Sequence, residues 1–219
     1  MDRDVMILTG AGQIGMAIAR RMGYGKKIVL GDRKKENAET IARIMNEAGF
    51  DVVPAEMDLA SRDSVRDLIA AARRYGDIGM LVNAVGVSPS QASVETILKV
   101  DLYGTAVLLE EVGKVIAEGG TGVTISSQSG HRMPALSPQE DEQLACTDTE
   151  ALLELEILAS VKPILILHPS GAAENVKNLS LPQVKNLAGG FGSCSEEPRA
   201  LCLRGSTSER FGTTMFCGL

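Results

Sequence analysis

The sequence predicts an α/β fold in which helices cover both faces of a doubly wound parallel sheet. The first indication is alternation: short apolar runs typical of buried strands alternate with segments of helical period over residues 5–127. Such alternation favours right-handed βαβ units. The second is a glycine-rich turn directly after the first apolar run. The 219 residues, of which 44% are hydrophobic, suffice for the core of one ordinary domain.

The individual elements follow from the period of the apolar residues. Strands are predicted at residues 5–9, 27–31, 51–55, 80–84 and 123–126, where apolar runs are short and end in small or polar residues. Helices are predicted at about 14–22, 34–48, 61–75 and 90–117. Ser61 is a typical helix N-cap, and Gly49 is a typical helix stop.

The pattern weakens beyond Ser127. We predict a loop at 130–147, a capping box of Thr147 and Glu150 before a helix at 151–158, and one further strand at 161–167. Residues 169–219 show no sustained period of either kind. We therefore expect a domain over 1–168 with an insertion at 130–160. The tail over 169–219 is unassigned, disordered or aberrant, and leaves the C-terminal portion of the fold atypical or incomplete.

Composition excludes several classes of function. A net charge of −6 argues against nucleic-acid and anionic-membrane partners, and the short basic cluster at 33–35 is typical of a solvated helix start. No signal peptide and no apolar run of transmembrane length are visible, so we expect a cytoplasmic protein. The four cysteines form no C-x-x-C pair and, with two histidines, no metal-binding spacing, so we expect reduced thiols and no metal site.

The glycine-rich turn G-A-G-Q-I-G lies between a predicted strand and a predicted helix. In this pattern Gly10 makes the tight turn, Gly12 lets the backbone approach a pyrophosphate, and Gly15 lets the helix pack close to the strand. The N–H groups and positive dipole end of the helix, which begins around Gln13 and Ile14, then face the phosphates. The placement predicts a Rossmann-type site for NAD or NADP.

Asp32 ends the second predicted strand, at about the spacing from the glycines expected of an acid that binds the adenine ribose. Its carboxylate would accept hydrogen bonds from the ribose hydroxyls and repel a 2′-phosphate, which favours NAD. Arg33 keeps NADP open, because a guanidinium can bind that phosphate. The alternative role for Asp32 is that of a helix cap.

Further candidates stand where the third and fourth predicted strands end, at the edge of a parallel sheet where ligands bind. These cofactor-binding candidates are Asp58, Leu59, Asn83, Ala84, Val85 and Gly86. Small residues after the fourth strand would let a ribose or adenine lie against the backbone. For Asn83 the alternative is an ordinary turn former.

The remaining candidates concern catalysis. Asp101 lies on the apolar stripe of the long helix, where a carboxyl is costly unless it is bonded or functional; a structural acid is the alternative. Ser126 and Ser127 end the fifth strand, where hydroxyls either bind a substrate carbonyl or make ordinary strand-end hydrogen bonds. His131 and Arg132 either border the pocket or belong to a surface loop.

Together these residues resemble the short-chain dehydrogenase/reductase family over about residues 5–130, in the branch that uses G-x-G-x-x-G. The resemblance implies an NAD(P)-dependent oxidoreductase that acts on a small-molecule alcohol or carbonyl. It implies that Ser127 orients the carbonyl and that Asp101 occupies the position of an asparagine that supports a proton-relay water. It also implies a homo-oligomer for intact relatives.

The family's proton donor is a tyrosine in Tyr-x-x-x-Lys, and this motif is absent after Ser127. The three tyrosines, Tyr24, Tyr75 and Tyr103, all precede it, and the resemblance stops near residue 160. Two hypotheses follow: an oxidoreductase impaired by the missing pair, or a non-catalytic dinucleotide-binding protein. In the second, the region after 160 is a frameshifted or truncated product.

Overall fold

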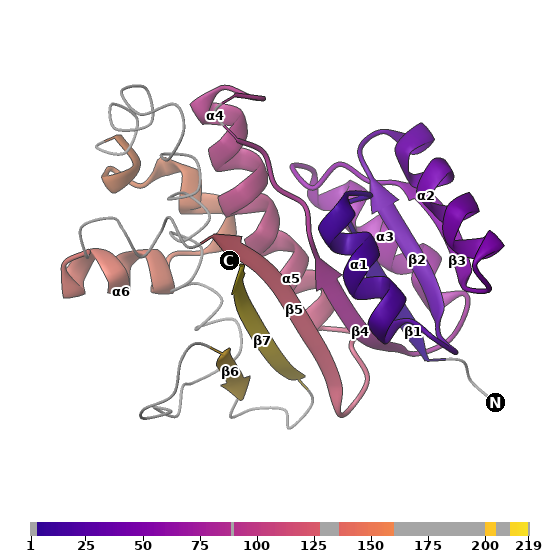
Figure 1. The fold of residues 1–219 in the computed structure, drawn as a ribbon. Coiled ribbons are helices and arrows are strands. Elements are labelled where there is room, and N and C mark those ends of the chain that lie inside the picture. The colour runs from indigo at the N-terminus through magenta and orange to yellow at the C-terminus, as the bar shows by residue number, and fades with distance from the viewer. Residues whose placement is uncertain (1–3, 89, 128–135, 160–199, 205–210, 219) are drawn as a thin grey trace.

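The computed structural model describes residues 4–88, 90–125 and 136–159, and the backbone alone at 126–127, 200–204 and 211–218. Its centre is a seven-stranded sheet of order β3-β2-β1-β4-β5-β7-β6 (Figure 1). The strands are β1 Val5–Thr9, β2 Lys27–Asp32, β3 Asp51–Glu56, β4 Ile78–Asn83, β5 Gly120–Ser127, β6 Ala200–Arg204 and β7 Phe211–Gly218. All neighbours pair in parallel except β6, which is antiparallel to β7. The predicted doubly wound α/β fold is confirmed.

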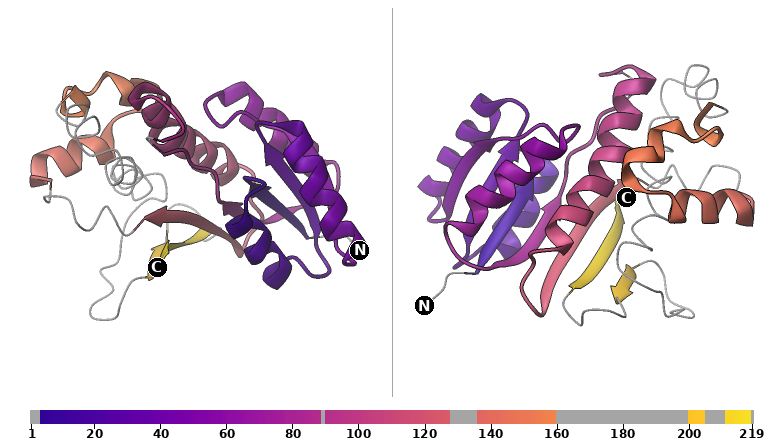
Figure 2. Two further views of the ribbon diagram at one scale, coloured as in Figure 1. Left: turned by 45° about the horizontal axis from the view of Figure 1, so that its top comes forward. Right: turned by 180° about the vertical axis from the view of Figure 1, so that it is seen from behind.

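Helices cover both faces of this sheet (Figures 1 and 2). They are α1 Gln13–Met22, α2 Lys35–Glu47, α3 Arg62–Arg73, α4 Val94–Ile97, the π-helix η1 Leu98–Gly104, α5 Thr105–Gly113, α6 Pro138–Cys146 and the 3-10 helix η3 Thr149–Glu154. The alternation of side chains along β1 separates two cores. Met6 and Leu8 pack with α1 and α2, while Val5 and Ile7 pack with α3 and α5.

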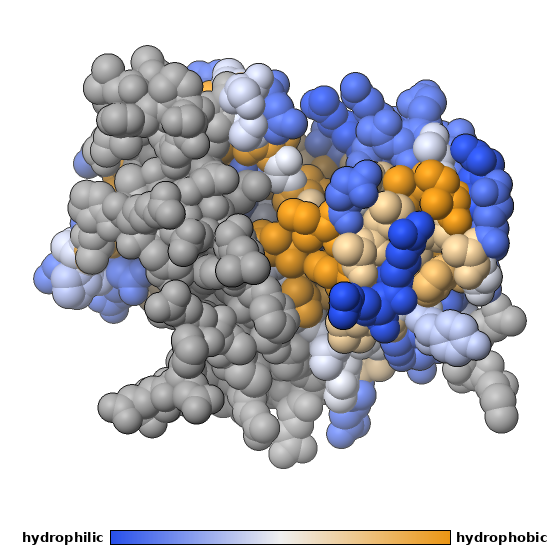
Figure 3. Space-filling model, in the orientation of Figure 1, coloured by the Kyte–Doolittle hydropathy of each residue, from blue (hydrophilic) through white to orange (hydrophobic). Residues whose placement is uncertain are grey.

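The surface on the α1 side carries an apolar patch between hydrophilic regions (Figure 3). Two large apolar side chains of α1, Ile14 and Met22, are 59% and 45% exposed. Across the described part of the chain, no helix is both long and apolar enough to cross a membrane.

The predicted long helix at 90–117 is shorter and not uniform. Ser93 caps its start by accepting a hydrogen bond from the N–H of Thr96, and α5 ends at Gly113, a residue of poor helix propensity. Between these ends, η1 widens the helix by one residue per turn. Such π segments are frequent at functional sites, and η1 contains Asp101.

Three predictions for the insertion differ from the structure. Residues 138–146 of the predicted loop form α6, because Ser137 and Glu140 make a capping box with Pro138 in the first turn. The capping box predicted at Thr147 does not exist. Thr147 is the C-cap of α6, and its hydroxyl donates to the carbonyl of Gln143 at 2.6 Å. Of the helix predicted at 151–158, residues 151–154 belong to η3, and only residues 157 and 158 are α-helical.

The tail differs from the expectation in another way. No regular element was predicted within 169–219, yet β6 and β7 lie there and β7 pairs with β5 over eight positions, from Gly120 opposite Phe211 to Ser127 opposite Gly218. The strand predicted at 161–167 falls outside the described residues.

Candidate functional site

A cleft of about 330 Å³ opens at the carboxyl ends of the parallel strands. It lies where the strand order reverses between β1 and β4, which is where ligands bind in open α/β sheets. Nine of the predicted cofactor-binding residues line it: Gly10, Gly12, Asp32, Arg33, Asp58, Leu59, Ala84, Val85 and Gly86. Sequence reasoning had thus brought together residues from four separate turns.

The glycines of the first turn differ in what a side chain would meet. At Gly10 the backbone has φ +93°, and a Cβ would lie 2.8 Å from the carbonyl oxygen of Ala84. A Cβ on Gly15 would lie 2.6 Å from the carbonyl oxygen of Gly10, so α1 packs closely on the turn. A Cβ on Gly12 would meet nothing within 4 Å and would project into open space beside the cleft.

The N-terminus of α1 faces this opening without a capping side chain. Its N-cap is Gly12, and its first turn contains no acidic residue. A helix start of this kind offers N–H groups and a positive dipole end to an anion. Gln13 and Ile14 open the helix and are exposed, but they do not line the cleft; Gly15 is buried beneath it.

Asp32 connects the glycine turn to the start of α2. One carboxylate oxygen accepts a hydrogen bond from the N–H of Ala11 and the other accepts one from the N–H of Lys34, each at 2.9 Å. Lys34, not Asp32, is the N-cap of α2, and it makes no side-chain cap. Each oxygen of Asp32 retains a second lone pair for a ligand hydroxyl. Arg33 and Lys34 line the cleft beside it.

Asp58 and Leu59 form the wall that follows β3. Asp58 Oδ1 accepts from the N–H of Ala60 at 2.9 Å, and the Asp58 N–H donates to Ser64 Oγ at 3.0 Å. Leu59 is only 3% exposed. This wall is therefore held by the first turn of α3, and it combines a carboxylate with a buried apolar residue.

Asn83 has a structural position behind the cleft. It is 1% exposed, and its Oδ1 accepts from Thr9 Oγ1 at 2.8 Å and from the Val85 N–H at 3.3 Å. These bonds join β1 to the turn after β4, as its alternative role of turn former would require, and Asn83 does not line the cleft.

The two catalytic candidates are not brought together by any described contact. Asp101 is 2% exposed, and its Oδ1 accepts from the N–H of Val87 at 3.0 Å, so this carboxylate holds a backbone that lines the cleft. Ser127 ends β5, as does Ser126 before it, but their side chains are outside the description. Residues 131 and 132 also lie outside the described residues.

Sequence reasoning missed several residues of the cleft, namely Ala11, Lys34, Asn37, Met57, Val87, Gln91 and Val100. The first five are direct neighbours of predicted site residues or lie one helical turn away, so adjacency and the helical period could have suggested them. Gln91 and Val100 come from a loop and a helix that carry no motif, and only the fold brings them to the cleft.

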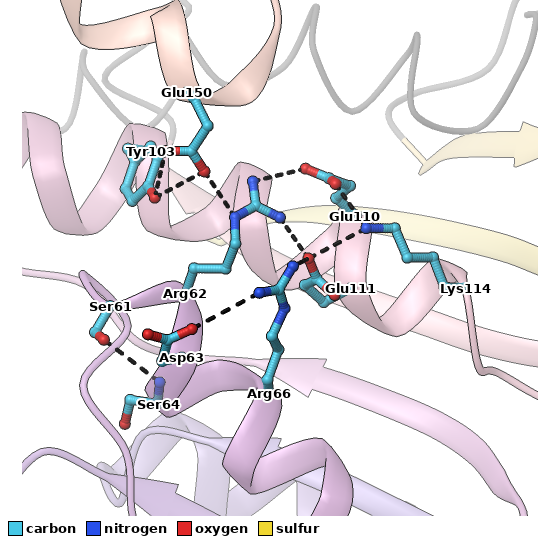
Figure 4. A network of polar contacts seen from close by, with 10 residues as sticks. All are labelled: Ser61, Arg62, Asp63, Ser64, Arg66, Tyr103, Glu110, Glu111, Lys114 and Glu150. Atoms are coloured by element: carbon cyan, nitrogen blue, oxygen red, sulfur yellow. Dashed lines mark hydrogen bonds and ion pairs between the residues drawn. The ribbon is translucent and has the colours of Figure 1, made fainter.

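A second polar cluster lies among α3, η1, α5 and η3 (Figure 4), and none of its residues lines the cleft. Arg62, whose side chain is 16% exposed, binds Glu110 through Nη2 at 2.9 Å, Glu150 through Nε at 2.7 Å, and Glu111 through Nη1. Tyr103 donates its hydroxyl to Glu150 at 3.1 Å. We call these residues, with Arg66 and Lys114, the Arg62 cluster.

The charges of the Arg62 cluster stabilise one another. The hydrogen bond from Arg62 is the largest cause that lowers the pKa of Glu110 to about 2. Burial opposes ionisation of Glu111, but hydrogen bonds from Arg66, Arg62 and Lys114 still lower its pKa. Burial and the neighbouring Glu150 raise the pKa of Tyr103. The cluster thus joins α3, α5 and η3 through ion pairs. Within the described residues, no group of three or more His, Cys, Asp or Glu side chains could hold a metal ion.

Comparison with known proteins adds to this geometry. The short chain dehydrogenase family matches residues 4–138. The short-chain dehydrogenase/reductase bsc3 of Alternaria brassicicola is 37% identical over 159 residues, which are 72% of this chain and 58% of that protein. The tropinone reductase-like 3 of Erythroxylum coca is 27% identical over 145 residues, or 61% of this chain and 56% of that protein. The chain therefore spans little more than half the length of either relative.

Solved structures give the same picture. An actinorhodin polyketide ketoreductase with NADPH superimposes with a TM-score of 0.53 at 28% identity, covering 62% of this chain and 57% of that one. A short chain dehydrogenase/reductase from Burkholderia phymatum in complex with NAD superimposes with a TM-score of 0.63 at 19% identity, covering 99% of this chain and 65% of that one. The second likeness concerns the fold alone.

Proposed function

This chain belongs to the short-chain dehydrogenase family, and from that premise we propose that it binds NAD in the described cleft, as an oxidoreductase of small-molecule alcohols or carbonyls. The observation that carries the proposal is the open face of Gly12 at the uncapped start of α1, with Asp32 beside it. A backbone without a Cβ can approach a pyrophosphate, which the helix start would bind.

We propose NAD rather than NADP because of Asp32. Its carboxylate keeps lone pairs for ribose hydroxyls and would repel a 2′-phosphate. NADP remains the second candidate, since Arg33 and Lys34 line the same part of the cleft and their cations favour a phosphate.

Bound NAD would supply a hydride acceptor, and the chain's own residues would bind and orient the reactants. The first turn of α1 would hold the pyrophosphate, Asp32 the adenine ribose, and Asp58 and Leu59 the adenine. Ser127, at the end of β5, would orient the substrate oxygen. Asp101 would act on the cleft through the Val87 N–H that it binds.

We further propose that proton transfer is impaired. All three tyrosines precede Ser127, and the Tyr103 hydroxyl donates to Glu150 in the Arg62 cluster, away from the cleft. Without a general acid, turnover would fall roughly 10²- to 10⁴-fold below that of a complete enzyme. The same observation favours the alternative of a dinucleotide-binding protein without turnover.

Calorimetry tests the cofactor, with Asp32→Ala and Asp32→Asn as paired variants. We expect micromolar NAD binding by the wild type and a loss of at least tenfold in Asp32→Ala, because two turn-forming hydrogen bonds and the ribose acceptor disappear. Asp32→Asn removes the charge but retains an amide oxygen, so its preference should shift toward NADP. Absence of NAD and NADP binding to the wild type would refute the proposal.

Activity is tested separately with a panel of secondary alcohols and ketones, followed at the absorbance of NADH. Turnover well below that of complete family members agrees with an impaired oxidoreductase. Binding without any turnover agrees with the alternative, and turnover at the level of complete enzymes would refute the proposed impairment.

A further inference from the structure

Gln91 stands in the turn between β4 and α4 and lines the cleft, although no motif points to it. Its side chain is hydrogen-bonded to Ser88. Gln91 Oε1 accepts a hydrogen bond from the Ser88 N–H and another from Ser88 Oγ, both at 3.0 Å. The backbone closes the same turn, because the N–H of Gln91 donates to the carbonyl of Ser88 at 2.8 Å.

These hydrogen bonds from Ser88 fix which way the side-chain amide of Gln91 faces. A backbone N–H can only donate, so the Gln91 atom that it meets must be the amide oxygen and not the nitrogen. Both hydrogen bonds from Ser88 therefore occupy the oxygen, and the NH₂ group is turned away from Ser88. A side-chain amide that could rotate freely would instead offer an oxygen or a nitrogen to a ligand with equal ease.

We propose that Gln91 is a specificity-determining residue whose side-chain NH₂, oriented by Ser88, donates a hydrogen bond to the adenosine half of a bound dinucleotide. This inference rests on the proposed function. The adenosine half is favoured because the same cleft is lined by Asp32 and Asp58, which are acceptors, and by the apolar Leu59 and Val100. An adenosine offers amino and hydroxyl donors to the carboxylates, and its ring nitrogens need a donor in return.

The two carboxylate acceptors and the oriented Gln91 donor would let the cleft distinguish adenine from other bases, in addition to raising its affinity. Hydrogen bonding sites reject analogues that leave their polar groups unpaired. Adenine presents an exocyclic amine beside an unprotonated ring nitrogen, whereas hypoxanthine presents an oxygen beside a ring N–H. A cleft that combines carboxylate acceptors with the Gln91 donor should therefore prefer adenine.

Two variants separate the effect of the Gln91 NH₂ donor from the effect of the hydrogen bonds between Ser88 and Gln91. Gln91→Glu retains an oxygen that accepts from Ser88 but replaces the donor by a second acceptor. Gln91→Met removes both functions without adding charge. Gln139→Met, on the exposed surface of α6 and outside the cleft, is the matched control. Because Gln91 is exposed, none of these changes should alter the thermal unfolding midpoint by more than a few degrees.

The experiment measures dissociation constants for NAD, ADP-ribose, nicotinamide mononucleotide and nicotinamide hypoxanthine dinucleotide. We expect Gln91→Met to weaken NAD and ADP-ribose binding roughly three- to tenfold, the range for one lost hydrogen bond. Gln91→Glu should weaken both further. The mononucleotide should bind wild type and variants alike, and the preference of the wild type for NAD over the hypoxanthine analogue should shrink in Gln91→Met.

The outcomes separate this inference from the proposed function. Asp32-dependent NAD binding that is equal in wild type and both Gln91 variants would overturn the role of Gln91 and leave the proposed function intact. A loss confined to the mononucleotide would overturn the assignment to the adenosine half. If the wild type binds neither NAD nor ADP-ribose, the proposed function and this inference both fail.

Discussion

Substitutions in the glycine turn can distinguish residues that the fold requires from residues that only the ligand requires. Gly12→Ala places a Cβ where, apart from the adjoining residues, nothing in the described part of the chain lies within 4 Å, and the backbone there has φ −93°, which alanine adopts without strain. We expect Gly12→Ala to lose at most about 1 kcal/mol of stability, because no packing contact is disturbed and only the weaker N-cap preference of alanine counts against it. Its NAD affinity should fall at least tenfold in calorimetry, because the methyl group occupies the pyrophosphate approach.

Gly10→Ala provides the matched contrast. Its Cβ would clash with Ala84, and its positive φ disfavours alanine, so the loss of stability should be about 2 kcal/mol in urea unfolding. Should Gly12→Ala destabilise the fold as much as Gly10→Ala, Gly12 would be a structural residue and its assignment to the cofactor would be wrong.

Residues in motifs were predictable, and residues without motifs were not. The glycines and Asp32 lie at spacings that follow from strand-turn-helix geometry, so the sequence alone identified one side of the cleft. Gln91 reaches the same cleft through a turn whose closure depends on Ser88, and no periodicity reports such a turn. The interior bonds of Asn83 were equally invisible, because they depend on the neighbouring strand.

At the scale of elements, the Arg62 cluster joins helices that are far apart in the chain, and its strength should depend on pH. The pKa of Glu110 is lowered to about 2 in the folded protein, against about 4.3 for an unperturbed glutamate. A lowered folded-state pKa adds stability that is complete above the ordinary pKa. That stability disappears as the pH falls through about 4 toward 2.

Urea unfolding at pH 7, 4 and 3 therefore distinguishes the wild type from Glu110→Gln. We expect the wild type to be more stable by about 1 kcal/mol at pH 7, a modest value because the ion pair is partly solvated. The difference should shrink as the pH falls. Glu142→Gln, an exposed change on α6, should show no such trend. A constant difference from pH 7 to 3 would contradict the role of Glu110 ionisation.

The elements themselves were predictable where their stability is local. The five strands and the first three helices follow from apolar period alone. The apolar period does not indicate the short helix α6, because few of its residues are apolar and its start depends on the capping box of Ser137 and Glu140. Glu150 instead accepts a hydrogen bond from Arg62. Sequence spacing cannot predict such a contact, because the two residues are far apart in the chain.

At the scale of the whole molecule, the tendency of chains to associate depends on whether the edge of the sheet beyond β5 is paired. An unpaired β5 would expose a row of N–H and C=O groups and invite association between chains. The structure pairs β5 with β7, although the two strands are separated by the entire insertion and most of the tail. Because β5 lies outside residues 169–219, no local pattern within those residues could have predicted the pairing.

Amide hydrogen exchange tests this pairing within a single strand. Residues 121–124 of β5 pair with both β4 and β7, whereas residues 125–127 pair with β7 only. In a chain that ends at residue 199, we expect the amides of 125–127 to lose protection while those of β1, which lies between β2 and β4, keep it. The shortened chain should also associate at high concentration in sedimentation velocity. Equal protection of residues 125–127 in the full and shortened chains would mean that β7 does not cover this edge, and the sheet would then end at β5 as the incomplete fold expected from the sequence.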